Sequence, residues 1–266
     1  MILLLIPLAI IVYLLMLYCR RGHPDLPKLR GHFYAHRGLH GEGCPENSMA
    51  AFRKAVEGGY GIELDVHLLA DGSLAVIHDS SLVRTTGQEG VVEDLTADRL
   101  SQIHLEGTEE TIPLFSQVLE LVSGKVPLII ELKTYKKNHA ALTDAVCRML
   151  EGYEGAYCIE SFDPFCVRRL RMHHPKVIRG QLAENFLKSN VKYPWLLKWI
   201  MTTQLVNFLT APDFVAYRFK DRDRLGVHIA RKLWGAQGVC WTITSQEDLD
   251  KAVAEEYIPI FEGFSP

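Results

Sequence analysis

Residues 61–79 read GIELDVHLLADGSLAVIHD, and they predict a strand, a tight turn and a second strand. Glu63 and Asp65 alternate with apolar residues in the first half, so both carboxylates point to one face of that strand. If the two halves fold back on each other about Asp71, counting places Asp65 close to His78. Two carboxylates and an imidazole then share one neighbourhood. For the set as a whole, we favour a functional site over a polar strand edge with a surface histidine.

Strands and helices alternate along the rest of the chain, which favours a parallel sheet. Eight strands are expected, leaving aside the second arm of the hairpin; they start at Phe33, Gly61, Pro127, Ala156, Val177, Asp213, Gly238 and Ile258. Eight parallel strands with alternating helices predict a (β/α)8 TIM barrel, here over residues 32–266. The polar, turn-rich segment 84–115 is expected to form a small insertion after the second strand.

The N-terminus predicts a membrane anchor. Residues 1–19 read MILLLIPLAIIVYLLMLYC and carry no charged side chain, and about 20 apolar residues suffice to span a bilayer. We therefore expect a transmembrane helix over residues 1–21 and a linker over residues 22–31. Basic residues follow the span and none precedes it, which predicts a single-pass protein whose main domain lies on the cytoplasmic side. A cleaved signal peptide is the competing interpretation, but it would begin with basic residues.

Composition narrows the class of partner. The formal net charge of −3 over 266 residues argues against nucleic acid, because no domain-wide basic field is available. The six cysteines show no metal-binding spacing and favour reduced, buried thiols.

The barrel would gather polar residues at the carboxyl ends of its strands, where such barrels keep their sites. Glu63 and Asp65 lie on the second strand and Glu131 ends the third. Clustered carboxylates repel one another unless a cation balances them, and an all-oxygen set selects a hard divalent cation, Mg²⁺ or Ca²⁺.

Basic and imidazole side chains complete this predicted site. Arg37 and Lys133 suit a substrate phosphate, the first by bidentate hydrogen bonding and the second as a point charge. His36 and His78 could remove a proton from the nucleophile and deliver one to the leaving alkoxide. Strand alternation is expected to point His67 away from Glu63 and Asp65, so the predicted site does not include it.

Several motifs in this order resemble the glycerophosphodiester phosphodiesterase family. They are HRG at 36–38, PENS at 45–48, ELD at 63–65, IHD at 77–79, RTTG at 84–87 and ELK at 131–133. The resemblance implies a TIM barrel with an insertion. It also implies an acid/base pair at His36 and His78, metal ligands at Glu63, Asp65 and Glu131, and phosphate contacts at Arg37 and Lys133.

Two further positions match residues near the family's site. Glu46 matches an acidic residue there, although a helix-start carboxylate or a loop anchor explains it equally well. Trp241 matches an aromatic residue that flanks the substrate, with a Trp of the barrel core as the alternative.

The reaction that the resemblance implies is hydrolysis of a glycerophosphodiester to sn-glycerol 3-phosphate and an alcohol. A lysophospholipase D that acts on membrane lysophospholipids is the alternative within the enzyme class. A catalytically idle, membrane-tethered module that binds phosphodiesters is the alternative from another class.

The chain departs from the family pattern in two places. The family usually ends in an Ile-Thr-Asp-x-Pro strand, whereas residues 260–266 read IFEGFSP, which leaves any polar role of that Asp open. The connection 183–212 is the least family-like segment. Within it, residues 191–209 combine two Trp and a Tyr with lysines and apolar residues, which favours membrane or lipid contact over a packed helix pair or a dimer contact.

Overall fold

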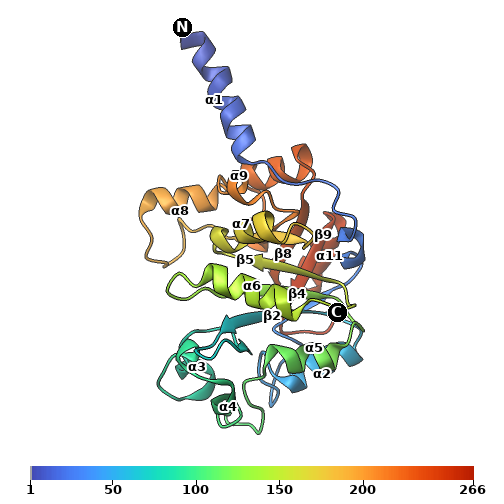
Figure 1. The fold of residues 1–266 in the computed structure, drawn as a ribbon. Coiled ribbons are helices and arrows are strands. Elements are labelled where there is room, and N and C mark those ends of the chain that lie inside the picture. The colour runs from blue at the N-terminus through green and yellow to red at the C-terminus, as the bar shows by residue number, and fades with distance from the viewer. Residues whose placement is uncertain (1) are drawn as a thin grey trace.

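The computed structural model describes residues 2–266, with side chains from Leu5 onward, and it shows a closed barrel of eight parallel strands (Figure 1). The strands are β1 (Tyr34–His36), β2 (Gly61–Leu68), β4 (Leu128–Leu132), β5 (Tyr157–Ser161), β6 (Arg179–Ala183), β7 (Phe214–Arg218), β8 (Gln237–Ile243) and β9 (Tyr257–Phe261). The ring closes because β1 pairs with both β2 and β9. The predicted (β/α)8 fold is confirmed.

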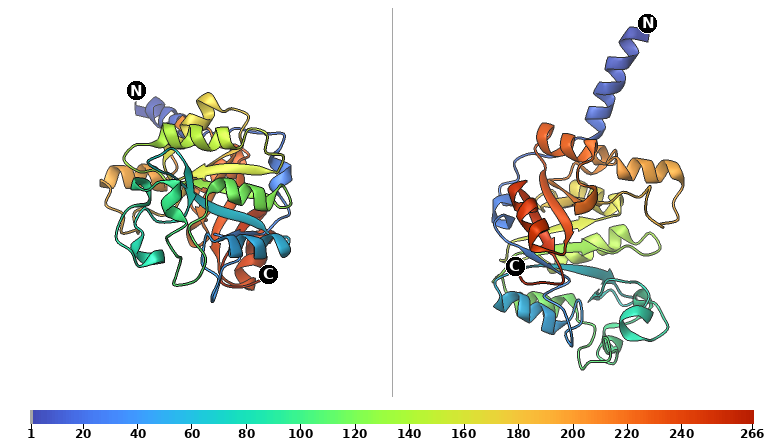
Figure 2. Two further views of the ribbon diagram at one scale, coloured as in Figure 1. Left: turned by 60° about the horizontal axis from the view of Figure 1, so that its bottom comes forward. Right: turned by 180° about the vertical axis from the view of Figure 1, so that it is seen from behind.

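Helices cover the outside of the barrel (Figure 2). They are α2 (Met49–Glu57), α5 (Phe115–Val122), α6 (His139–Met149), α7 (Pro164–His173), α10 (Leu225–His228) with the π-helical turn η4 (Ile229–Leu233), and α11 (Gln246–Ala254). Outward-facing residues of β2 such as Ile62 and Leu64 pack with Phe115 of α5 in the largest core cluster.

The hairpin folds in the register expected from a turn about Asp71. Strand β3 (Leu74–Val76) runs antiparallel to β2, with Val66 opposite Val76, and the amide of Ile77 donates to the carbonyl of Asp65 at 3.1 Å. The Asp71 carboxylate accepts from the amide of Ser73 at 2.9 Å, which fixes the turn. His78 therefore follows β3 beside the carboxylates of β2.

The insertion packs on the outer side of this hairpin. It contains α3 (Val83–Thr86), the 3-10 turn η2 (Val92–Asp94) and α4 (Ala97–Leu100). Leu74 and Val76 face the main core, whereas Ala75 and Ile77 face a separate small core under the insertion. Strand alternation thus lets β3 join the two cores.

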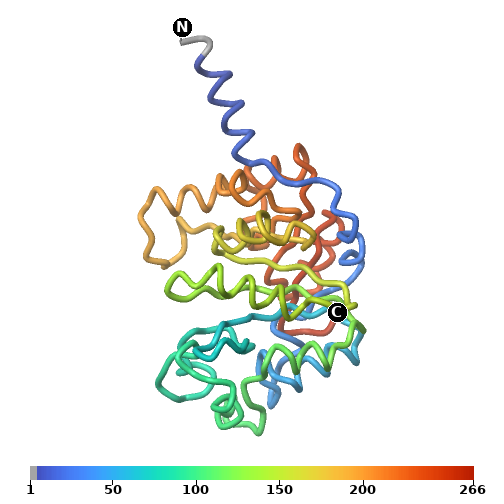
Figure 3. The backbone as a smooth tube through the Cα atoms, in the orientation of Figure 1, coloured from blue at the N-terminus to red at the C-terminus, as the bar shows by residue number. Residues whose placement is uncertain are grey.

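The connection after β6 forms α8 (Trp195–Thr202) and α9 (Asn207–Thr210). Met201 and Val206 are buried against β7, so part of this segment packs on the barrel as a pair of helices. The tube in Figure 3 shows the insertion and this connection as two excursions at the same end of the barrel.

Inward-facing strand residues are arranged in layers. An apolar layer includes Tyr34, Ile129, Cys158, Val239 and Ile260. Two residues further along each strand, on the same face, come His36, Glu131, Glu160, Trp241 and Glu262. The barrel interior is therefore apolar toward the amino ends of the strands and polar at their carboxyl ends.

The predicted membrane anchor is wrong. Helix α1 (Ile2–Met16) projects away from the barrel (Figures 1 and 2), but none of the helices within residues 2–266 is long and apolar enough to cross a membrane. Its 15 residues rise about 22 Å, against a hydrocarbon core of about 30 Å. Leu17 and Cys19, which the prediction counted within the span, are fully buried against the barrel. Met1 lies outside the described residues.

Part of the membrane hypothesis falls with the anchor. This applies to the single-pass topology with a cytoplasmic catalytic domain, which depended on the span. The contact with a membrane or lipid predicted for residues 191–209 is a surface contact that a spanning helix does not test, and it stays a prediction. The predicted linker at 22–31 also packs on the barrel, because it holds the 3-10 turn η1 (Leu26–Leu29), whose two leucines are buried.

Candidate active site

Three carboxylates meet at the carboxyl end of the barrel. Glu63 and Asp65 lie on β2, and Glu131 lies directly opposite Asp65 on β4. One oxygen from each of the three lies within 4.8 Å of the others, and all three side chains are buried. The structure thus brings together the residues that the sequence grouped as a candidate cation site.

The charges of this cluster are only partly balanced. Lys133 Nζ lies 3.0 Å from Asp65 Oδ1 and 2.7 Å from Glu131 Oε1. Burial and the neighbouring Asp65 raise the pKa of Glu63 well above its ordinary value. Burial opposes ionisation of Asp65 too, but Lys133 and other nearby cationic groups outweigh it and lower the Asp65 pKa. The cluster therefore favours an additional cation or a proton.

The donor set fits a hard divalent cation, since it offers three carboxylates and no sulfur. Asn47 supports this set: its Nδ2 donates to Asp65 Oδ2 at 2.8 Å, which leaves Oδ1 for the contact with Lys133 Nζ at 3.0 Å. The Glu63 carboxylate is positioned from the other side, where the backbone amide of Arg37 donates to Oε2 at 3.0 Å.

Each predicted catalytic histidine is paired with a carboxylate through Nδ1. His36 Nδ1 lies 2.7 Å from Glu262 Oε2, and its Nε2 lies 3.9 Å from Glu63 Oε2. His78 Nδ1 lies 2.6 Å from Asp79 Oδ1. Because a carboxylate engages Nδ1, the opposite ring nitrogen of each histidine is turned toward other partners. Burial lowers the pKa of His78 to about 4.

Glu46 joins the site to the insertion. Its carboxylate lies 3.0 Å from Arg37 Nη1 and 2.6 Å from Arg84 Nη2. Arg84 also contacts Asp79, so a chain of alternating charges connects Arg37 to the carboxylate partner of His78. This arrangement agrees with the loop-anchor interpretation of Glu46.

Trp241 stands beside the site on β8. Its ring packs edge-on against Phe162, with centroids 5.6 Å apart. Next to this pair, a cleft of about 310 Å³ is lined by His78, Lys133 and Phe162 among others. Trp241 is half-buried and also packs against the inner barrel core. Its position therefore agrees with both alternatives, an aromatic residue beside the substrate and a Trp of the barrel core.

Four residues near the site were missed in the sequence. Glu262 and Glu160 belong to the same inward layer as His36 and Glu131, and Asn47 belongs to the PENS motif. The prediction that His67 points away from Glu63 and Asp65 is wrong, because residues 63, 65 and 67 are two apart and share a face of the strand. His67 is buried, with Nε2 at 3.2 Å from the carbonyl of His78 and Nδ1 at 2.7 Å from Glu93. Strand alternation, counted correctly, therefore places the His67 side chain on the same side of β2 as the candidate site.

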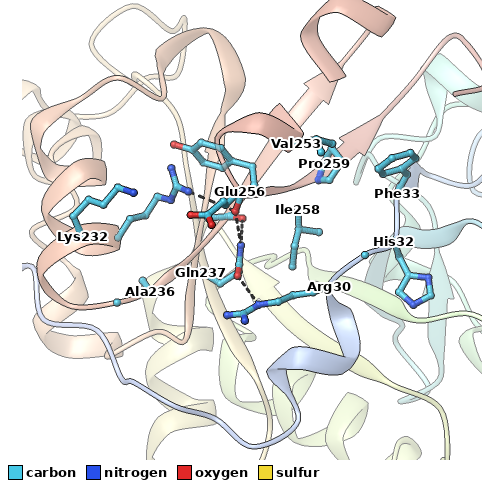
Figure 4. A pocket seen from close by; sticks show the side chains of 15 residues that line it. Arg30, His32, Phe33, Lys232, Ala236, Gln237, Val253, Glu256, Ile258 and Pro259 are labelled. Atoms are coloured by element: carbon cyan, nitrogen blue, oxygen red, sulfur yellow. Dashed lines mark hydrogen bonds between the residues drawn. The ribbon is translucent and has the colours of Figure 1, made fainter. Parts of the chain in front are cut away.

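Another hollow, of about 400 Å³, opens at the amino ends of β8 and β9 (Figure 4). Its polar groups largely bond one another: Arg30 donates to Gln237 at 2.8 Å, and Gln237 donates to the carbonyl of Glu256 at 3.0 Å. Parallel strands place this hollow at the end of the barrel opposite the carboxylates, so it is separate from the candidate active site.

Fold and site together define a (β/α)8-barrel phosphodiesterase. The sequence model of the glycerophosphoryl diester phosphodiesterase family matches residues 36–261, and the chain belongs to this family. The resemblance drawn from the motifs and the assignment as a glycerophosphodiester phosphodiesterase are therefore confirmed.

Individual relatives agree with this membership. A glycerophosphodiester phosphodiesterase of Caldanaerobacter subterraneus subsp. tengcongensis is 29% identical over 232 residues, which cover 82% of this chain and 88% of the relative. The lysophospholipase D GDPD1 of Rattus norvegicus is 34% identical over 133 residues, which cover 45% of this chain and 41% of that protein. The structure of an Oleispira antarctica phosphodiesterase in complex with the product sn-glycerol-3-phosphate shares the fold, with a TM-score of 0.71 at 21% identity over 87% of this chain and 92% of that one.

Proposed function

We propose that the chain hydrolyses glycerophosphodiesters to sn-glycerol 3-phosphate and an alcohol, using one divalent cation and a pair of histidines. The observation that carries the proposal is the position of the buried carboxylate cluster between two histidine–carboxylate pairs. Glu63, Asp65 and Glu131 would hold the cation, which when bound supplies charge stabilisation at the phosphoryl oxygens.

The chain's own residues then divide the remaining tasks. Arg37 and Lys133 hold the substrate phosphate, since both are cationic side chains held against the carboxylate cluster. His36 and His78 transfer protons, one removing a proton from the nucleophile and the other donating one to the leaving alkoxide. At neutral pH His78 is uncharged, because burial lowers its pKa to about 4, and an uncharged imidazole can accept a proton.

The proposal is tested by following choline release from glycerophosphocholine by the full chain. We expect turnover that EDTA abolishes and that Mg²⁺ or Ca²⁺ restores, with sn-glycerol 3-phosphate as the second product. Glu63→Gln should lose both the activity and the thermal stabilisation that added metal gives to wild type. Glu57→Gln, at an exposed position at the end of α2, is the matched control and should behave as wild type. Turnover that persists in EDTA, or that survives in Glu63→Gln, would refute the role of the metal.

A further inference from the structure

His67 is a buried polar side chain to which the proposed reaction gives no role. It lies on the same face of β2 as Glu63 and Asp65, further toward the carboxyl end of the strand. Only 2% of its surface is exposed, and it lines the same cleft as His78. Its hydrogen bonds therefore deserve the same account as those of the site.

The two ring nitrogens of His67 contact two different parts of the molecule. Nε2 lies 3.2 Å from the backbone carbonyl oxygen of His78, and because a carbonyl oxygen only accepts, Nε2 donates this hydrogen bond. Nδ1 lies 2.7 Å from Oε1 of Glu93, which belongs to η2 of the insertion. His67 thus connects the insertion with the backbone of a histidine that transfers a proton in the proposed reaction.

Glu93 also fixes the chain just after His78. Its Oε1 accepts from Ser80 Oγ at 2.6 Å, and the amide of Val92 donates to the carbonyl of Ser80 at 2.9 Å. Burial opposes ionisation of Glu93, but the contacts with His67 and Ser80 outweigh it and lower the Glu93 pKa, so the carboxylate can accept both bonds. The insertion therefore holds this segment two residues after His78, and His67 holds it at His78 itself.

Stability alone does not explain a buried pair of His67 and Glu93. Burial of an imidazole and a carboxylate costs desolvation free energy, and replacing such pairs by apolar residues of similar volume is often neutral or stabilising. An apolar side chain, however, offers no donor to the His78 carbonyl. The position of that peptide matters for catalysis, because a displacement of a reacting group by about 1 Å can lower a rate about 10²-fold.

We propose that His67 is a positioning residue for the phosphodiesterase reaction. It holds the backbone of His78 so that the His78 imidazole reaches the substrate, and Glu93 of the insertion holds His67 in turn. The inference rests on the proposed function, since it requires His78 to transfer a proton. His67 itself contacts no reacting atom, and its role depends on the single hydrogen bond from Nε2.

The test uses two amide side chains that imitate different halves of an imidazole. The amide nitrogen of Gln can take the place of Nε2, whereas that of the shorter Asn can take the place of Nδ1. His67→Gln should therefore keep kcat for glycerophosphocholine within about threefold of wild type, because the bond that positions His78 remains. His67→Asn retains only the contact with Glu93, so kcat should fall by about 10–100-fold with KM little changed. Both variants are uncharged, so a difference between them is not an effect of charge.

A metal-binding measurement and a matched control separate this role from a general structural one. Added Mg²⁺ or Ca²⁺ should still stabilise both variants against heat, which shows that the ligand Asp65, two residues away, is undisturbed. His23→Asn is the control, because His23 is 8% exposed and its Nε2 lies 3.0 Å from the carbonyl of Lys176, before the amino end of β6. This variant should lower the melting temperature and leave kcat unchanged.

Glu93→Gln tests the connection to the insertion. We expect kcat to fall by less than in His67→Asn, with KM unchanged, because the imidazole keeps its bond to the carbonyl but loses the charged partner that holds the ring. This variant also decides the matter if His67→Asn does not fold. A lowered kcat at unchanged KM would then support the inference, and a wild-type kcat would refute it.

Three results would overturn the inference while leaving the proposed function intact. The first is a wild-type kcat in His67→Asn although His78→Ala loses activity. The second is an equal loss in His67→Gln and His67→Asn, since packing or charge would then matter rather than the bond to the carbonyl. The third is an equal loss in His23→Asn, which would indicate general destabilisation. Full activity of His78→Ala would instead refute the proposed function, and this inference with it.

Discussion

The two histidine–carboxylate pairs of the site have nearly the same geometry but are assembled in different ways. His78 is next to Asp79 in the sequence, and the ring nitrogen lies 2.6 Å from the carboxylate. His36 is separated from Glu262 by 226 residues, and the corresponding distance is 2.7 Å. The first pair depends on a local turn after β3. The second pair exists only because β1 and β9 are neighbours in the closed barrel.

The surroundings of the two carboxylates differ as well. Asp79 is contacted by Arg84 of the insertion, and Arg84 also binds Glu46. Glu262 has His40 Nε2 at 3.5 Å from its other oxygen, and the two neighbouring imidazoles, first that of His36 and then that of His40, lower the Glu262 pKa, which keeps that carboxylate ionised. One pair is thus supported by the insertion and the other by the barrel itself.

Loss of either imidazole should have the largest effect. We expect His36→Ala and His78→Ala each to lower kcat by about 10²–10⁴-fold, because each removes one of the two proton transfers. Metal binding, measured by thermal shift, should persist in both. His228→Ala, at an exposed position on α10, is the control. If one variant stays within tenfold of wild type, the two histidines do not share the catalytic tasks.

Neutralising the carboxylate partners should have a smaller effect. We expect Glu262→Gln and Asp79→Asn each to lower kcat by about 10–100-fold with KM little changed, because the imidazoles remain but lose their orienting charge. Asp79→Asn should in addition shift the pH–rate profile to lower pH, since the hydrogen bond to Asp79 raises the His78 pKa against the effect of burial. Glu42→Gln, exposed in the loop after β1, is the control. Wild-type kcat in Glu262→Gln would show that barrel closure contributes no positioning to His36.

The same contrast explains what could be read from the sequence. Glu63, Asp65 and His78 were predictable because strand alternation and one turn place them together within 16 residues. Glu160 and Glu262 escaped notice although they lie in the same inward layer. Their position depends on the register between β4 and β5 and between β9 and β1, which involves hydrogen bonds between strands distant in the chain.

The N-terminal error has a related physical cause. Hydropathy sums the apolar character of a segment, but it does not show where the helix ends. Helix α1 ends at Met16, and Leu17 and Cys19 are fully buried against the rest of the protein rather than continuing the helix. As with Glu262, contacts between residues far apart in the sequence determine the structure of this segment, and hydropathy does not show them.

The smallest effect should come from Arg84, and it distinguishes the two pairs most directly. Its side chain is 48% exposed, and ion pairs of exposed side chains contribute about 0.2–1 kcal/mol, so Arg84→Gln should lower kcat only about twofold to fivefold. Because Arg84 acts through Asp79, its effect should largely vanish when Asp79→Asn is already present. Combined with Glu262→Gln, the two effects should multiply, since distant sites add in free energy within about 0.5 kcal/mol. A double-mutant cycle on kcat measures both couplings. Equal coupling of Arg84 to Asp79 and to Glu262 would mean that the two histidine–carboxylate pairs are supported as one unit.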